Sequence, residues 1–236
     1  MSIEKKVLVF TATYNEADNI YELISSIKKQ VPNAHLLIID DNSPDGTASI
    51  IEKAKLELKN IFLIKRNCKL GLDTAHKEAY NFATQYNYDY LVTMDADFSH
   101  DPKEIKNFIR NLENYPFVIG SRYIDGGECL MKGRRLILSK YGNLFMRFFL
   151  KVNCSEFTTS YRGFNIKELK GFHLNQVKSN GYSFFMGTVF EISKQKFNIK
   201  EIPIIFKDRI NGYSKIPRIE IIRTLFNLIK LKFKSI

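Results

Sequence analysis

Residues 36–47 read LLIIDDNSPDGT, an apolar run that ends in two aspartates and a turn. A strand that is apolar at every position is typical of a sheet covered by helices on both faces. Residues 43–46 have the composition of a tight turn, and a helical stretch begins at Thr47. The stretch therefore predicts a buried strand, a turn and a helix, with carboxylates where the strand ends.

The same alternation extends through the first 120 residues. We expect strands at Val7–Thr13, Ala34–Ile39, Ile61–Lys65, Tyr90–Met94 and Phe117–Gly120, and helices at Asp18–Gln30, Thr47–Leu58, Asp73–Tyr86 and Pro102–Leu112. Regular alternation with short links predicts an α/β fold with a mostly parallel sheet. Ligands of such sheets bind beyond the carboxyl ends of the strands, so polar residues there are candidate functional groups.

The length of 236 residues suits one α/β domain, and a hydrophobic content of 44% excludes wholesale disorder. Three separated cysteines, Cys68, Cys129 and Cys154, form no CxxC pair and no zinc-binding spacing. We therefore expect reduced thiols in a cytosolic compartment. No run approaches the roughly 20 apolar residues of a membrane span, and residues 1–10 do not resemble a signal peptide.

The net charge of +11 is concentrated in two segments. Residues 129–151 hold six Lys or Arg and no acid, and residues 207–236 hold eight against two acids. Both also carry large apolar side chains at helical spacing, among them Phe145 and Phe148. Basic side chains beside an apolar stripe suit a helix on the anionic, cytoplasmic surface of a membrane. A stripe that packs on the core is the alternative, and a basic patch alone also fits nucleic acid or a phosphorylated substrate.

Three of the expected strands end in polar residues, Thr13–Glu16, Asp40–Ser43 and Asp95–Asp97. Residues i and i+2 of an extended segment point the same way, so Asp95 and Asp97 can present two carboxylates to one point. Two close carboxylates need a cation between them, and Mg²⁺ or Mn²⁺ suits oxygen ligands and substrate phosphates.

Helix capping is the alternative role for an aspartate that follows a strand. Asp101, Pro102 and Glu104 are better placed to start the next helix than Asp95 or Asp97. The other strand ends are less specific. Asp40 and Asp41 either contact a nucleobase or ribose or close the turn that follows.

The order of several segments resembles family 2 glycosyltransferases of the GT-A fold, and most of all the dolichyl-phosphate (polyprenyl-phosphate) mannosyltransferase branch. The resemblance runs from Val7 to about Leu231. It is carried by TATYNEADNI, IIDDNSPDGT, KLGLDTAHKEA, MDADFSHDP, GSRYIDGG, RRLILSKYGN, TTSYRGF, SNGYSFF and EIPIIFKDRINGYSK.

The resemblance implies a metal-dependent transfer of one sugar from a nucleotide-sugar donor, with inversion. The donor-binding residues that it implies are Thr13, Tyr14, Glu16, Ile39 and Asp41 around the nucleoside, and Asp95, Ala96, Asp97 and Arg122 at the diphosphate. Asp95 and Asp97 would hold Mg²⁺ or Mn²⁺, and Ser99 stands where some members use Gln as a further metal contact. Other departures from the family pattern are Asp73 and Gly187.

The resemblance also implies an anionic acceptor site. Its residues would be Arg135, Arg162, Arg209, Ser214 and Lys215, and the catalytic set would be Asp95, Asp97, Arg122 and Arg209. The chain would then divide into a nucleotide-sugar-binding half, 1–128, and an acceptor-binding half, 129–236, of a single GT-A domain. A surface ion pair is the alternative for each arginine taken alone.

The charge pattern favours a phosphate acceptor over a hydroxyl. A sugar hydroxyl needs a general base to remove its proton. A phosphate monoester is already largely ionised at neutral pH, because its second pKa is about 6. The later half is rich in Lys and Arg, and it also carries the apolar stripes that a lipid tail requires. The absence of Trp excludes the QxxRW motif of processive synthases.

These observations favour a peripheral membrane enzyme that moves mannose from GDP-mannose to a polyprenyl or dolichyl phosphate. A UDP-sugar donor of the glucose or N-acetylhexosamine type, or a glycan hydroxyl acceptor, is the alternative. A membrane-spanning partner protein is compatible with this function. A nucleic-acid-binding protein is disfavoured because the aromatic residues lie in apolar runs and do not alternate with basic residues.

Overall fold

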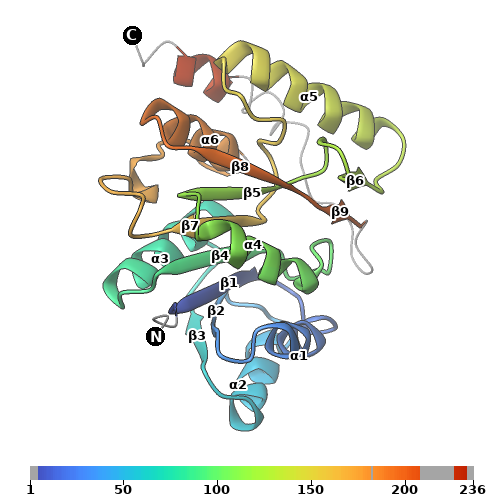
Figure 1. Cartoon of the computed structure of the whole chain (residues 1–236). Coiled ribbons are helices and arrows are strands. Elements are labelled where there is room, and N and C mark those ends of the chain that lie inside the picture. The colour runs from blue at the N-terminus through green and yellow to red at the C-terminus, as the bar shows by residue number, and fades with distance from the viewer. Residues whose placement is uncertain (1–4, 182, 208–225, 233–236) are drawn as a thin grey trace.

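The structure is a computed structural model that describes residues 5–181, 183–207 and 226–232 (Figure 1). Its main sheet has seven strands in the order β3-β2-β1-β4-β7-β5-β8. The strands are β1 (Val7–Thr13), β2 (His35–Asp40), β3 (Ile61–Lys65), β4 (Tyr90–Met94), β5 (Phe117–Ser121), β7 (Arg162–Asn165) and β8 (Ile199–Pro203). Only β7 runs antiparallel to its neighbours in this sheet. The predicted α/β fold with a mostly parallel sheet is confirmed.

The helices and the minor sheet complete the architecture. The helices are α1 (Ile20–Gln30), α2 (Thr47–Glu57), α3 (Leu72–Gln85), α4 (Ile105–Leu112), α5 (Arg134–Leu150) and α6 (Ser183–Lys194). Short 3₁₀ turns cover Pro102–Glu104 and Leu174–Gln176, and residues 226–232 are helical. Two short strands, β6 (Glu128–Cys129) and β9 (Ile205–Phe206), pair in parallel beside the main sheet. Every element expected in the first 120 residues is present, with ends shifted by at most three residues.

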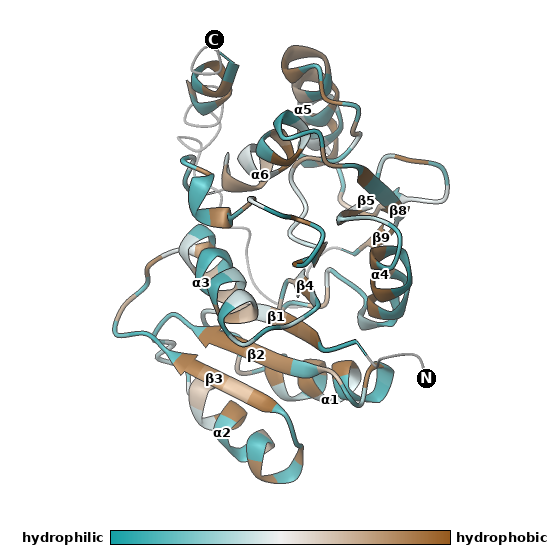
Figure 2. Cartoon of the chain, turned by 60° about the vertical axis from the view of Figure 1, so that its left-hand side comes forward, coloured by the Kyte–Doolittle hydropathy of each residue, from teal (hydrophilic) through white to brown (hydrophobic). Residues whose placement is uncertain are grey.

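The sheet is buried on both faces, as the apolar run 36–39 predicts. Leu37 and Ile39 pack in one hydrophobic cluster with residues of α3 and α6, while Leu36 and Ile38 pack in a second with residues of α1, α2 and α4. The ribbons of β1 and β2 are accordingly largely hydrophobic in Figure 2. Helices therefore cover both faces, and the edges of the sheet remain for polar groups.

Strands from the later part of the chain complete the same sheet. β7 inserts between β4 and β5, and β8 pairs with β5 in parallel. α5 contributes Met146 and Leu150 to the first cluster and lies beside residues 226–232 at one end of the molecule (Figure 1). The proposed division at residue 128 therefore separates two parts of one continuous sheet.

Candidate active site

The strand register brings the predicted polar strand ends together. Thr13 of β1 is level with Asp40 of β2, and Thr11 is level with Met94 of β4. The carboxyl ends of these three strands therefore meet at one edge. Thr13 Oγ1 donates a 2.8 Å hydrogen bond to Asp40 Oδ1 across that edge.

Asp40 and Asp41 have different partners. Asp40 is buried and accepts hydrogen bonds from the Ser43 N–H and hydroxyl as well as from Thr13, so it closes the turn. The Asp41 carboxylate lies 2.9 Å from Arg66 Nη1, and its Oδ2 accepts the Gly71 N–H at 3.1 Å. Arg66 also pairs with Glu78 at 2.7 Å. Arg66 was not among the predicted residues, because a single arginine after a strand belongs to no recognisable motif.

Of the other predicted nucleoside residues, Tyr14 and Glu16 directly follow β1 at the same edge. The Tyr14 ring is half-buried and lies 3.7 Å below Lys69 Nζ. The Glu16 carbonyl oxygen accepts the N–H groups of Asn19 and Ile20 at the start of α1, and the Glu16 carboxylate accepts a hydrogen bond from the Asn19 side chain. Ile39 is fully buried in β2, so its side chain belongs to the core.

The Asp95–Asp97 segment leaves β4 at the neighbouring position. Asp95 is 30% exposed in its side chain, and its Oδ1 accepts a 2.5 Å hydrogen bond from Ser160 Oγ. Asp97 is 5% exposed, and its Oδ1 accepts both the N–H and the hydroxyl of Ser99. A serine donor thus fixes one oxygen of each carboxylate.

Ser99 orients Asp97 in this structure. The serine is fully buried, and its hydroxyl donates to Asp97 Oδ1 at 2.6 Å. Across residues 5–181, 183–207 and 226–232, no three His, Cys, Asp or Glu side chains are grouped to hold a metal ion. Two carboxylates still fit Mg²⁺ or Mn²⁺, since these ions keep several waters and bind substrate phosphates.

His100 supports the Asp95 backbone from below. Its Nδ1 accepts the Asp95 N–H at 3.1 Å, and its Nε2 lies 3.2 Å from Thr159 Oγ1. Burial lowers the pKa of His100, and the nearby charges of Asp95 and Asp97 offset this only in part. The neutral ring therefore carries its proton on Nε2. The sequence analysis missed this residue, although it lies within the segment MDADFSHDP.

Arg122 forms a buried ion pair with Glu156, a residue that was not predicted from the sequence. Its Nε and Nη2 donate to the two oxygens of Glu156 at 2.7 and 2.8 Å, and Nη2 also donates to Thr158 Oγ1. Burial alone would lower the pKa of Arg122, but the charge of Glu156 raises it above its ordinary value. Burial alone would raise the pKa of Glu156, but Arg122 holds it below its usual range.

Two of the remaining predicted arginines, Arg162 and Arg135, lie on different elements of the fold. Arg162 is buried in β7, where its Nε and Nη2 donate to the carbonyl oxygens of Thr159 and Phe157 and its Nη1 has no hydrogen-bond partner among the described residues. This placement does not favour its predicted contact with an acceptor phosphate. Arg135 is exposed in the first turn of α5.

Three further predicted acceptor residues, Arg209, Ser214 and Lys215, lie outside the described residues. The described chain that leads toward them reaches the site, since the Lys207 N–H donates to the Ser99 carbonyl oxygen. A hollow of about 600 Å³, lined by residues such as Lys5 and His35, lies at the opposite end of the strands and contains no predicted site residue.

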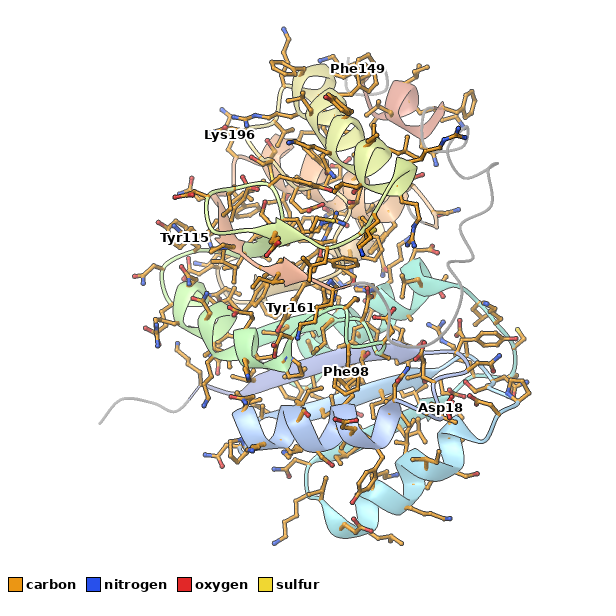
Figure 3. All side chains as sticks on the ribbon, turned by 90° about the vertical axis from the view of Figure 1, so that its right-hand side faces the viewer. Asp18, Phe98, Tyr115, Phe149, Tyr161 and Lys196 are labelled. Carbon is orange, nitrogen blue, oxygen red and sulfur yellow. The ribbon has the colours of Figure 1, made fainter. Side chains whose placement is uncertain are left out.

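Residues 156–160, which we call the linking loop, join the separate groups of the site. Glu156 and Thr158 hold Arg122, Thr159 contacts His100, and Ser160 donates to Asp95. The next residue, Tyr161, packs in the same hydrophobic cluster as Phe98 of the loop after β4, and Figure 3 labels both side chains. One short segment therefore positions the arginine and the first aspartate.

α5 exposes an apolar face together with basic side chains. The exposed apolar residues recur at the spacing of one helical face, Ile137, Leu138, Tyr141, Leu144, Phe145 and Phe148. The exposed basic residues are Arg134, Arg135, Lys140, Arg147 and Lys151. Phe226 and Ile229 add exposed apolar surface beside the helix, and Lys232 lies 5.8 Å from the ring of Phe149, which Figure 3 labels. In the part of the chain that the structure describes, no helix is long and apolar enough to cross a bilayer.

Comparisons with known proteins agree on one family. Residues 8–171 match the model of glycosyl transferase family 2. A polyprenol monophosphomannose synthase of Mycolicibacterium smegmatis is 32% identical over 95% of this chain and 86% of its own. An undecaprenyl-phosphate mannosyltransferase of Micrococcus luteus is 31% identical over 89% and 87%. A solved mannosyltransferase of Pyrobaculum calidifontis in complex with GDP-Man and Mn²⁺ has the same fold, with a TM-score of 0.62 and 17% identity over 99% of this chain and 65% of that one.

Proposed function

The chain belongs to glycosyl transferase family 2, and from this we propose that it transfers one mannosyl group from GDP-mannose to a polyprenyl phosphate. The two curated relatives named for this acceptor class match most of its length at 32% and 31% identity. The observation that carries the proposal is the linking loop, which holds an arginine and an aspartate at the carboxyl edge of the sheet. An arginine can bind phosphate oxygens, and an aspartate can help to hold a divalent cation beside the donor diphosphate.

The donor nucleoside is assigned to the ends of β1 and β2. Guanine offers N–H donors beside an acceptor oxygen. The Asp41 carboxylate with the Arg66 guanidinium beside it matches that edge. Each oxygen of Asp41 already accepts one bond and can accept another. The half-buried ring of Tyr14 offers a stacking surface.

The diphosphate is assigned to Asp95, Asp97 and Arg122. The two aspartates would hold Mg²⁺ or Mn²⁺, which when bound neutralises charge on the donor diphosphate. Arg122 has Nε and Nη2 committed to Glu156 and Thr158, so its Nη1 group is the part of the fork that we assign to a phosphate oxygen. Its raised pKa keeps it charged throughout the reaction.

The reaction needs no general base from the protein. An oxygen of the acceptor phosphate, already ionised at neutral pH, attacks the anomeric carbon. The bond from that carbon to the donor diphosphate oxygen breaks, and its electron pair leaves with GDP. The negative charge that gathers on GDP is stabilised by the Arg122 side chain. Attack opposite the leaving group inverts the anomeric centre.

We also propose that α5 lies on an anionic membrane surface. Its apolar face is exposed, and its basic residues can contact acidic headgroups while that face enters the headgroup region. A polyprenyl phosphate presents its charged group at this level. The helix would therefore bring the site to its acceptor.

A donor and acceptor panel tests the proposal. The purified chain is incubated with GDP-mannose, UDP-glucose or UDP-N-acetylglucosamine, with polyprenyl phosphate or soluble glycans, and with Mn²⁺ or EDTA. We expect product from GDP-mannose and polyprenyl phosphate only when Mn²⁺ is present. Asp97→Ala should abolish it. Asp101→Asn, which keeps the N-cap of the following turn, is the matched control and should stay within about threefold.

The alternative donors and acceptors remain distinguishable in the same panel. Transfer from a UDP-sugar would replace the donor assignment. Turnover on soluble saccharides without lipid phosphate would replace the acceptor assignment.

A further inference from the structure

α5 buries one polar side chain among its described contacts with the core. The buried residues of the helix are Asn143, Met146 and Leu150, and Asn143 is 1% exposed. Burying an amide is unfavourable unless its hydrogen-bonding groups find partners. An apolar side chain would fill this position without that cost. The hydrogen-bond partners of the amide therefore indicate why an asparagine stands here.

Asn143 joins α5 to the linking loop. Its Oδ1 accepts the Phe157 N–H at 2.7 Å in a buried position. Its Nδ2 donates to the Ser139 carbonyl oxygen at 2.8 Å and to Thr158 Oγ1 at 3.4 Å. The Nδ2 group therefore bonds to both α5 and the linking loop, and Oδ1 bonds to the loop.

The loop residues that receive these bonds lie next to the charged groups of the site. Thr158 Oγ1 accepts from Arg122 Nη2 at 2.6 Å and donates to Glu156. Phe157 lies between Glu156 and Thr158, so its N–H fixes the backbone of the residues that clamp Arg122. A displaced Phe157 would shift both partners of the arginine.

A second contact between α5 and the same region supports the link. The Tyr123 hydroxyl lies 2.6 Å from Ser139 Oγ, and Tyr123 follows Arg122 directly in the chain. At the other end of the loop, Ser160 donates to Asp95. The helix is thus connected to both the arginine and the aspartate through five residues.

We propose that Asn143 is a positioning residue, which holds the linking loop against α5 and so sets Arg122 and Asp95 for transfer. The inference rests on the proposed function and deepens it, because α5 is also the helix assigned to the membrane surface. An acceptor that arrives at that surface then meets Arg122, which the linking loop holds in a fixed position relative to α5. In this assignment Asn143 acts through its contacts with Phe157 and Thr158.

The first test separates positioning from packing. Asn143→Leu removes both amide functions at similar volume, and Met146→Leu is the matched control, buried one turn away on the same helix. Misplacing catalytic groups without removing them costs roughly ten- to hundredfold in rate. We expect kcat to fall by about that factor in Asn143→Leu, with KM for GDP-mannose within about twofold, since the nucleoside is assigned to the ends of β1 and β2 and not to the linking loop. Unchanged kcat per folded enzyme would overturn the proposal.

Thr158 provides a pair of variants at an exposed residue, outside both hydrophobic clusters. Thr158→Val removes the hydroxyl that joins Asn143 to Arg122, and Thr158→Ser keeps it. We expect kcat to fall in Thr158→Val and to recover in Thr158→Ser. Equal kcat in the two variants would count against the link, whatever the fate of Asn143→Leu.

Hydrogen exchange measures the link without turnover. In Asn143→Leu the amides of residues 156–160 should exchange at least about tenfold faster than in the wild type and in Met146→Leu, because the Phe157 N–H has lost its acceptor. Unchanged exchange there would refute the coupling. If the wild-type chain transfers no sugar from any donor, the proposed function fails, and this measurement still decides the role of Asn143.

Discussion

Arg122 and Glu156 form an ion pair in which neither charge can be removed without stranding the other. Glu156 is fully buried, and besides Arg122 it accepts the N–H groups of Thr158 and Thr159. Truncating one partner of a buried pair costs more than the pair itself contributes, because the remaining charge stays desolvated. The pair therefore fixes where the guanidinium lies.

Glu156→Gln should therefore damage both stability and transfer. Loss of the carboxylate leaves Arg122 buried without its counter-charge, and we expect the free energy of unfolding to fall by about 3–5 kcal/mol. Urea unfolding followed by circular dichroism measures this. Glu191→Gln, at a half-buried residue of α6, is the control and should change little. A stability equal to that of the wild type would show that the charge of Glu156 is dispensable.

The buried side chain of His76 makes the stability of the folded chain depend on pH. It is buried against the rings of Phe10 and Phe185, and burial, reinforced by Arg162, lowers its pKa to about 3. At a pH below 6.5, the ordinary pKa of histidine, His76 binds a proton in the unfolded chain but stays neutral in the folded chain. Stability contributed by neutral His76 is therefore complete above pH 6.5 and is lost as the pH falls toward about 3.

His76→Leu should flatten this dependence. Between pH 6.5 and pH 4 we expect the free energy of unfolding of the wild type to fall more steeply than that of the variant, by at most about 1.4 kcal/mol per pH unit. Urea titrations at half-unit pH steps measure both slopes. Parallel curves for the two proteins would mean that His76 does not titrate in this way.

Among the elements, α5 combines two surfaces with opposite requirements. Its inner side carries Asn143, Met146 and Leu150, and its outer side carries the exposed apolar face. Figure 2 shows both hydropathy colours along its ribbon. A helix that served only the core would not need the outer face, which is why we assign it to a membrane surface.

Acidic substitutions on the outer face should weaken membrane binding alone. In Ile137→Glu/Phe148→Glu, the second at a side chain with 71% exposure, we expect binding to phosphatidylglycerol vesicles to fall at least about tenfold. The free energy of unfolding should change by less than about 0.5 kcal/mol. Co-sedimentation measures the binding. Leu56→Glu, at an 88% exposed residue of the distant helix α2, is the control, and an equal loss there would contradict the assignment (Figure 1).

For the whole molecule, the proposed donor site joins strand ends that are far apart in the sequence. A ligand that binds only the folded chain stabilises it by about 2.7 kcal/mol at a hundred times its Kd, which corresponds to roughly 5–10 °C in Tm for a chain of this size. We expect GDP with Mn²⁺ to give this shift, and GDP with EDTA or Mn²⁺ alone to give much less. Differential scanning fluorimetry measures all three.

The same measurement separates the two donor classes. A larger shift from UDP than from GDP would transfer the nucleotide assignment to a UDP-sugar. Asp97→Ala should lose the part of the shift that depends on Mn²⁺. A full shift in that variant would remove Asp97 from the metal site.

The sequence by itself determined the strands and helices of the first 120 residues and the meeting of their polar ends. These features have a local period: an apolar run such as residues 36–39 can only be buried, and the spacing of Asp95 and Asp97 predicts a shared direction wherever the backbone between them is extended. The match of the ordered segments to a family added the donor chemistry.

Only the tertiary structure decided what surrounds those carboxylates. Arg122 meets Glu156 across 34 positions, Asp41 meets Arg66 across 25, and Asn143 meets Phe157 across 14. Arg162, expected to contact the acceptor, lies buried because β7 enters the middle of the sheet. Partners of this kind leave no periodic trace in the chain, since each contact depends on how separate elements pack and not on the spacing within any one of them.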